Sequence, residues 1–182
     1  MYEPLVREGF EWVNTVDDAD YERFRSFDGT PLVDNWTPVR VQLVRAIDRR
    51  QLRESDFPWL GSHALILREL AIARLQHLIA PCAEILPLEA DDGANLFVLN
   101  VLKVIDALDE ERSGGIIRVP NTDRIALVRQ PYFHEERIRG IDLFRLPFRS
   151  SPTYASQEFV DAVAVAGLLG LDFNRVWPSP DN

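Results

Sequence analysis

The chain has 182 residues, of which 46% are hydrophobic and 27% are charged, and its formal net charge is -9. This composition predicts one folded domain with a buried core and excludes a largely disordered chain. The excess of acidic side chains also argues against non-specific binding to nucleic acid, because the phosphates would be repelled.

The negative charge lies mainly in the first part of the chain. Residues 1–111 carry 21 acidic and 11 basic side chains, whereas residues 112–182 carry 8 acidic and 9 basic side chains. Two interpretations of this acidity stay open. It keeps a cytosolic protein soluble, or it steers a basic partner toward the protein and speeds their encounter.

Several features indicate a cytoplasmic protein. The first residues lack the charged and apolar segments of a secretion signal, and no stretch approaches about 18 uninterrupted apolar residues. The single cysteine, Cys82, excludes an intramolecular disulfide, and its apolar surroundings predict a buried, inert thiol. We therefore expect no membrane association.

Between residues 8 and 81, the pattern of hydrophobic residues predicts three strands and one helix. Alternating residues indicate strands over 8–14 and 38–46, with Phe10 and Trp12 on one face of the first. Residues 17–35 are rich in turn formers and contain at most a short helical turn. A loop at 55–58 precedes a short strand at 65–67, which runs into an amphipathic helix that ends at Pro81.

Two strands over 84–88 and 95–105 flank a turn at 89–93 and predict a hairpin with an acidic tip. A run of carboxylates at 106–111 follows, and the Gly114-Gly115 pair is interpreted as a flexible turn.

Further strands are expected at 124–128, 141–146 and 170–176, with a helix that is capped by Ser156 and terminated by Gly167. Residues 178–182 are expected to be a frayed tail. We thus predict a single α+β domain over residues 1–182, in which a mostly antiparallel sheet packs against two or three helices.

The sequence lacks the residue spacings that common catalytic sites require. His63, His77 and His134 are scattered, and the His134-Glu135-Glu136 run lacks the second histidine of a zinc-protease helix because Ile138 occupies that position. No nucleophile elbow, phosphate-binding glycine loop or zinc-ligand cluster occurs. We therefore expect no enzymatic activity, no cofactor and no catalytic residue.

Clustered carboxylates are the candidate site residues. They are Glu89, Asp91 and Asp92 at the predicted hairpin tip, and Asp109, Glu110 and Glu111 after the second strand. Such residues form a solvated acidic loop, a docking surface for a protein, or, together with Asp106, the metal ligands of a hydrolase. The sequence leaves these three interpretations open.

Several short motifs resemble a bacterial immunity family. They are Ser55-Asp56-Phe57-Pro58-Trp59, Leu65-Ile66-Leu67, Glu84-Ile85-Leu86-Pro87-Leu88, Asn100-Val101 through Asp106-Ala107-Leu108-Asp109 to Ser113, Asp142-Leu143-Phe144-Arg145-Leu146-Pro147, and Ala166-Gly167-Leu168-Leu169-Gly170-Leu171-Asp172-Phe173. The family is immunity protein family eleven of polymorphic toxin systems, formerly a domain of unknown function. The resemblance covers residues 55–177, and residues 1–54 form the N-terminal part of the same domain.

The resemblance implies a cytoplasmic antitoxin that binds and neutralises a cognate secreted toxin, with no turnover. It supplies no catalytic residues, so the expected contact residues are the six carboxylates named above, facing a basic toxin. We expect no nucleic-acid or membrane partner and leave the oligomeric state open. The alternatives are a metal-dependent hydrolase and a structural subunit of a larger assembly.

Overall fold

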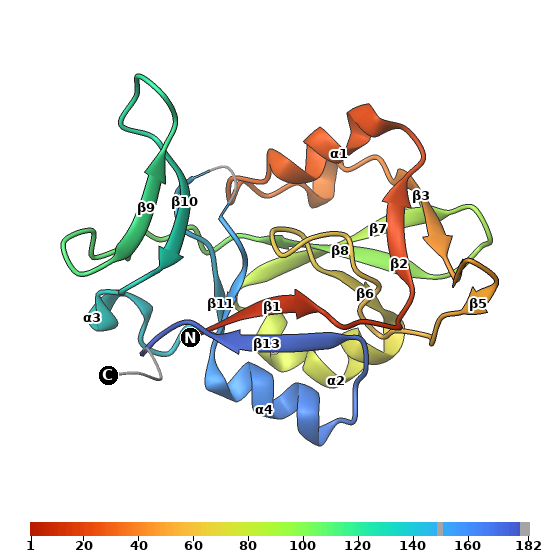
Figure 1. Cartoon of the computed structure of the whole chain (residues 1–182). Helices are drawn as coiled ribbons and strands as arrows, with labels where there is room; N and C mark the ends of the chain where they lie inside the picture. The colour runs from red at the N-terminus through yellow and green to blue at the C-terminus, as the bar shows by residue number, and fades with distance from the viewer. Residues whose placement is uncertain (149–150, 179–182) are drawn as a thin grey trace.

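The computed structural model describes residues 1–148 and 151–178 and has an α+β fold (Figure 1). The predicted combination of mostly antiparallel sheet and packed helices is confirmed. Sheets of five and four strands form the body of the protein. Two smaller two-stranded sheets, β9–β10 and β4–β5, lie at opposite ends of the body (Figure 1).

The five-stranded sheet has the order β2-β3-β7-β8-β6. Its strands are β2 (Trp12–Thr15), β3 (Val39–Val44), β6 (Ile66–Arg68), β7 (Ala83–Ala90) and β8 (Leu96–Val101). Neighbours are antiparallel except for β3 and β7, which are parallel. The alternation that predicted β3 is matched by its burial, since Val39, Val41 and Leu43 are buried and the residues between them are exposed.

The four-stranded sheet joins the two ends of the chain and has the order β11-β12-β1-β13. Its strands are β1 (Tyr2–Val6), β11 (Leu143–Phe144), β12 (Tyr154–Ala155) and β13 (Leu171–Arg175). β1 pairs with β13 along its whole length and with β12 only at Tyr2. The strand at residues 2–6 was not predicted from the sequence.

The helices are α1 (Asp18–Arg25), α2 (Glu69–Ile79), α3 (Glu135–Ile138) and α4 (Gln157–Val165), and η1 (Val33–Asn35) is a 3-10 helix. α2 and α4 share one core through Leu75 and Phe159, which pack in the same cluster as Leu99 of β8. α1 inserts Phe24 into the core on the other face of the sheet, where Val98 of β8 also lies. The five-stranded sheet is therefore covered by helices on both faces (Figure 1).

A two-stranded arm, β9 (Gly114–Arg118) and β10 (Ile125–Gln130), extends away from the body (Figure 1). The predicted strand at 124–128 corresponds to β10, but the flexible turn predicted at Gly114-Gly115 is wrong because these glycines begin β9. Gly115 has φ +64°, and a Cβ there would lie 2.9 Å from the side chain of Arg129 on β10. Glycine thus permits the close approach of the two strands.

A second short hairpin follows β3 and consists of β4 (Ala46–Ile47) and β5 (Arg50–Gln51). The sequence did not predict it. Its two-residue turn, Asp48-Arg49, has positive φ at both positions.

Several predicted boundaries also change. Of the strand expected at 8–14, only the part in β2 is formed. The strand expected at 95–105 ends at Val101. There the chain turns, and the N–H groups of Leu102 and Lys103 donate hydrogen bonds to the Cys82 carbonyl. Only Leu143–Phe144 of the 141–146 segment is a strand. The helical turn expected near Phe24 is an eight-residue helix, which Asp17 caps by accepting from the Ala19 N–H at 2.9 Å. Residues 179–182 of the expected tail lie outside the described residues.

A close contact between Ser55 and Gly170 joins the segment before β6 to the turn before β13. Ser55 is fully buried, and its Oγ lies 1.7 Å from the point that a Cβ on Gly170 would occupy. Beside it, Asp56 and Leu169 exchange two hydrogen bonds of 2.9 and 2.7 Å. Gly170 also has φ +109°, so glycine is required both for space and for backbone conformation.

We predict that Gly170→Ala lowers the free energy of unfolding by about 3 kcal/mol, because the new methyl group displaces Ser55 and the backbone is strained. Gly167→Ala is the matched control. Its φ is +66° but nothing lies within 4 Å of a Cβ there, so the expected loss is only about 1 kcal/mol. Urea denaturation measures both values, and equal losses would contradict the steric explanation.

Candidate functional site

The six predicted carboxylates form two separate groups. Asp91 and Asp92 lie in the turn between β7 and β8, and Glu89 lies beside it near the end of β7, so the predicted hairpin with an acidic tip is observed. The other group, Asp109, Glu110 and Glu111, lies in the loop before β9. Figure 1 places the β7–β8 turn and the loop before β9 at opposite ends of the molecule. The structure therefore does not bring the two groups together.

Two carboxylates of the β7–β8 turn contact arginines of neighbouring elements. Glu89 lies 3.8 Å from Arg40 of β3, and both side chains are about two-thirds exposed. Asp92 forms an ion pair with Arg45 and accepts a 3.0 Å hydrogen bond from the Ala94 N–H. The Ala94 N–H and the Arg45 guanidinium hold the pKa of Asp92 below its ordinary value. Asp92 is therefore part of the turn's own structure.

The loop before β9 is organised by its own polar contacts. Asp109 accepts a 3.1 Å hydrogen bond from the Arg112 N–H through its side chain, and its carbonyl accepts one of 2.6 Å from the Ser113 hydroxyl. Glu110 forms an ion pair with Arg118 of β9. Glu111 is exposed, and within residues 1–148 and 151–178 neither it nor Asp91 has a side-chain hydrogen bond or ion pair.

The geometry gives these carboxylates no catalytic arrangement. No group of three or more histidine, cysteine or acidic side chains in the described part of the chain is positioned to hold a metal ion. Asp106, which the metal-site interpretation adds to these carboxylates, lies 3.7 Å from Arg137. Two-metal hydrolysis needs carboxylates that converge on one point, and the two groups lie at opposite ends of the molecule.

The histidines and the cysteine also stay apart from one another. Cys82 is buried, as predicted, and His134 precedes α3. Burial, together with the charges of Arg145 and Arg25, lowers the pKa of His63 to about 4. His63 is therefore neutral near pH 7 and is packed edge-on against Tyr21, with ring centroids 5.5 Å apart.

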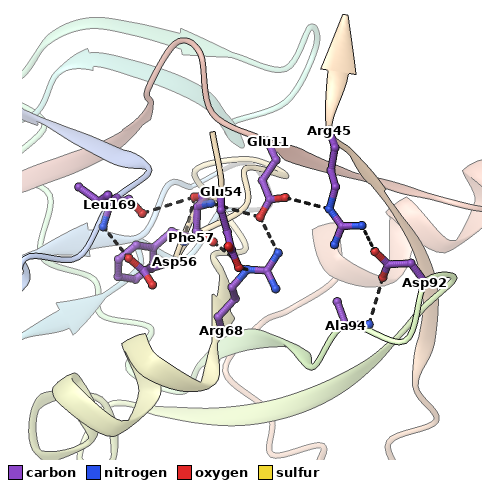
Figure 2. A network of polar contacts seen from close by, with 10 residues as sticks. Glu11, Arg45, Glu54, Asp56, Phe57, Arg68, Asp92, Ala94 and Leu169 are labelled. Atoms are coloured by element: carbon purple, nitrogen blue, oxygen red, sulfur yellow. Dashed lines mark hydrogen bonds and ion pairs between the residues drawn. The ribbon is translucent and has the colours of Figure 1, made fainter. Parts of the chain in front are cut away.

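The sequence interpretation missed a buried polar network that supports the β7–β8 turn (Figure 2). At its centre is Glu11, whose side chain is 2% exposed. Its carboxylate accepts a 2.5 Å hydrogen bond from Arg68 and one of 3.2 Å from the Ser55 N–H, and it lies 3.4 Å from Arg45. Arg45 in turn contacts Asp92, so the surface turn is tied to a buried charge (Figure 2). No spacing in the sequence joins positions 11, 45 and 68.

Comparison with known proteins adds a family match. A model of the Imm11 immunity protein family matches residues 81–177, which run from the residues just before β7 to the residues just after β13 and include both acidic groups. A search of curated proteins finds no match. Among the described helices, none combines the length and the apolar character that crossing a bilayer would demand.

We predict that Glu11→Ala lowers the free energy of unfolding by about 3 kcal/mol, because it leaves the arginines beside it without their buried partner. Glu54→Ala is the control. Glu54 lies 3.6 Å from the same Arg68 but is 77% exposed, so its loss is expected to cost less than about 1 kcal/mol. Urea denaturation at pH 7 tests the pair, and a similar loss for both variants would contradict the role given to Glu11.

Proposed function

The chain belongs to the Imm11 immunity protein family, and from that premise we propose that it neutralises a cognate secreted toxin by stoichiometric binding. The family match carries this proposal, because it extends over more than half of the chain and assigns an immunity role. The protein acts inside the producing cell, in the cytoplasm, and binds the toxin without chemical turnover.

The arrangement of the polar residues supports a binding function. The carboxylates lie on or beside surface turns, where binding residues are commonly found, and they do not form a metal-binding group in the described residues. The metal-dependent hydrolase therefore receives no support from the geometry. A structural subunit would differ from an antitoxin by self-association in the absence of toxin.

Charge complementarity is the main attraction that we assign to the interface. With a net charge of -9, the protein attracts a basic surface and accelerates the encounter with it. A toxin that acts on nucleic acid carries such a surface, because it must bind phosphates. An acidic inhibitor then occupies the groove that the phosphates would occupy.

The contact residues proposed are the two carboxylate groups, at the β7–β8 turn and in the loop before β9. Asp91 and Glu111 are the members whose side chains have no hydrogen bond or ion pair in the described structure, so these side chains reach a toxin at no cost to the fold. Glu89, Asp92 and Glu110 contribute a more local field because arginine side chains lie beside them. Asp109 is held by the backbone N–H of Arg112. The two groups lie at opposite ends of the molecule, so each is tested separately.

Association with a toxin is the direct test of this function. The protein is co-expressed with the C-terminal domain of the secreted protein encoded beside its gene, and the mixture is analysed by size-exclusion chromatography with light scattering. We expect a complex of defined stoichiometry at micromolar concentration. Two separate peaks at that concentration would refute the proposal.

We predict that changing Asp109, Glu110 and Glu111 together to Ser lowers the association rate by roughly three- to tenfold at low salt and weakens its dependence on salt. The control changes Asp34, Glu158 and Asp161 to Ser, which alters the net charge equally on other exposed elements. Stopped-flow or surface plasmon resonance measures the rates. If the two triple variants associate at the same rate, the loop before β9 is not part of the interface.

A further inference from the structure

An open groove of about 680 Å³ lies between the β1–β2 connection and the β4–β5 hairpin. Neither the six carboxylates nor the buried network lines it. Its apolar wall contains Val6, Phe10, Trp12, Ile47 and Leu52. Val6 and Ile47 are 48% and 44% exposed, so the groove presents large hydrophobic side chains to solvent.

The same groove is bordered by positive charge. Residues 45–53 contain four arginines and one aspartate, in a chain whose net charge is -9. Arg50 lines the groove, and Arg53 stacks over the ring of Phe10 with its guanidinium carbon 4.5 Å from the ring centroid. Glu8 and Asp48 line the groove as well and offset two of these charges, and Arg45 is paired with Glu11 and Asp92. Arg49, Arg50 and Arg53 still outnumber the two acids. In the part of the chain that the structure describes, the side chains of Arg49 and Arg50 have no hydrogen bond or ion pair.

The turn of the hairpin holds an arginine in a backbone conformation that suits glycine. Asp48 and Arg49 have φ values of 47° and 68°, as a two-residue hairpin turn requires. Asn-Gly or Asp-Gly is the usual sequence for such a turn, because a side chain at the second position is strained. A strained arginine at an exposed tip, where glycine would fold better, indicates that its side chain has a role outside the fold.

We propose that this groove binds an extended segment of a partner protein that carries carboxylates beside apolar side chains. The identification of that partner as the toxin rests on the function proposed above, but the chemistry of the segment follows from the groove alone. Its apolar residues pack against Phe10 and Ile47, and its carboxylates pair with Arg49 and Arg50. β4 and β5 pair only with each other among the described strands, so their outer edges also offer backbone hydrogen bonds to an added strand.

A polypeptide fits the groove better than a nucleic acid does. The arginines border an apolar surface, whereas a nucleic-acid groove needs positive charge along the whole backbone path. The acidic β7–β8 turn also lies at this end of the molecule, linked to the base of the hairpin by the Arg45–Asp92 ion pair (Figures 1 and 2). A nucleic-acid strand carries a phosphate at every step and would meet these carboxylates, whereas a polypeptide needs its carboxylates only where the arginines lie.

The groove is tested with a peptide, without the toxin. The ¹⁵N-labelled protein is titrated with an eight-residue peptide that alternates leucine and glutamate and is blocked at both ends. We expect shifts in the amide signals of residues 47–52 and in the indole signal of Trp12. A peptide that alternates leucine and lysine, and an eight-nucleotide oligothymidylate, are expected to leave these signals unchanged.

The variants Arg49→Gly and Arg50→Ser are each expected to weaken binding of the leucine–glutamate peptide at least threefold. Arg49→Gly is the more decisive variant, because glycine fits φ 68° without strain. The melting temperature of this variant should therefore be no lower than that of the wild type. Asn121→Gly is the matched control, since it makes the same kind of change at φ 61° in the tip of the β9–β10 arm, and should bind as the wild type does.

Unchanged binding by Arg49→Gly and Arg50→Ser would overturn the proposal, as would equal binding of the lysine peptide or of the oligonucleotide. Because no toxin is present, these results are independent of the association test. If the protein binds the peptide but no toxin, the antitoxin function is refuted and the peptide-binding groove is supported. If it binds a toxin but not the peptide, the antitoxin function is supported and the peptide-binding groove is refuted.

Discussion

The need to pair a buried carboxylate constrains much of this fold. Glu11 is almost fully enclosed, and a charge in the protein interior is stable only when partners of opposite charge and hydrogen-bond donors surround it. Its partners, Arg45, Arg68 and the Ser55 N–H, come from three separate segments, so these segments must be in place together. Through Arg45 the same requirement extends to Asp92, so a surface turn is tied to the buried charge beneath it.

The surfaces that result carry charges of both signs at one end of the molecule. The β7–β8 turn is acidic, the neighbouring β4–β5 hairpin is rich in arginine, and one ion pair holds the two together. A partner that docks here must present a matching arrangement, which sets its orientation as well as its affinity. Such a surface favours specificity, because a partner with positive charge alone matches only half of it.

The parts of the fold that the sequence predicted are those with local signals. The alternation of β3, the apolar stripe of α2 and the acidic turn between β7 and β8 each depend on residues close together in the chain. The sequence did not predict β1, because proline is unusual in a strand and Pro4 lies at its centre. The missing N–H of Pro4 is tolerated because β12 pairs with β1 only at Tyr2 and does not extend to Pro4. The six carboxylates were found on exposed turns, but their arginine partners were not predicted, because Arg45 and Asp92 are joined only by tertiary structure.

The pairing of β1 with β13 affects how the protein folds during synthesis. Residues 2–6 are synthesised long before residues 171–175, yet the two segments are hydrogen-bonding partners. β1 therefore lacks this partner until residue 175 has left the ribosome, and closing so long a loop slows folding. A chain that stops before residue 171 cannot form this pair of strands, so β1 keeps one open edge until β13 has been made.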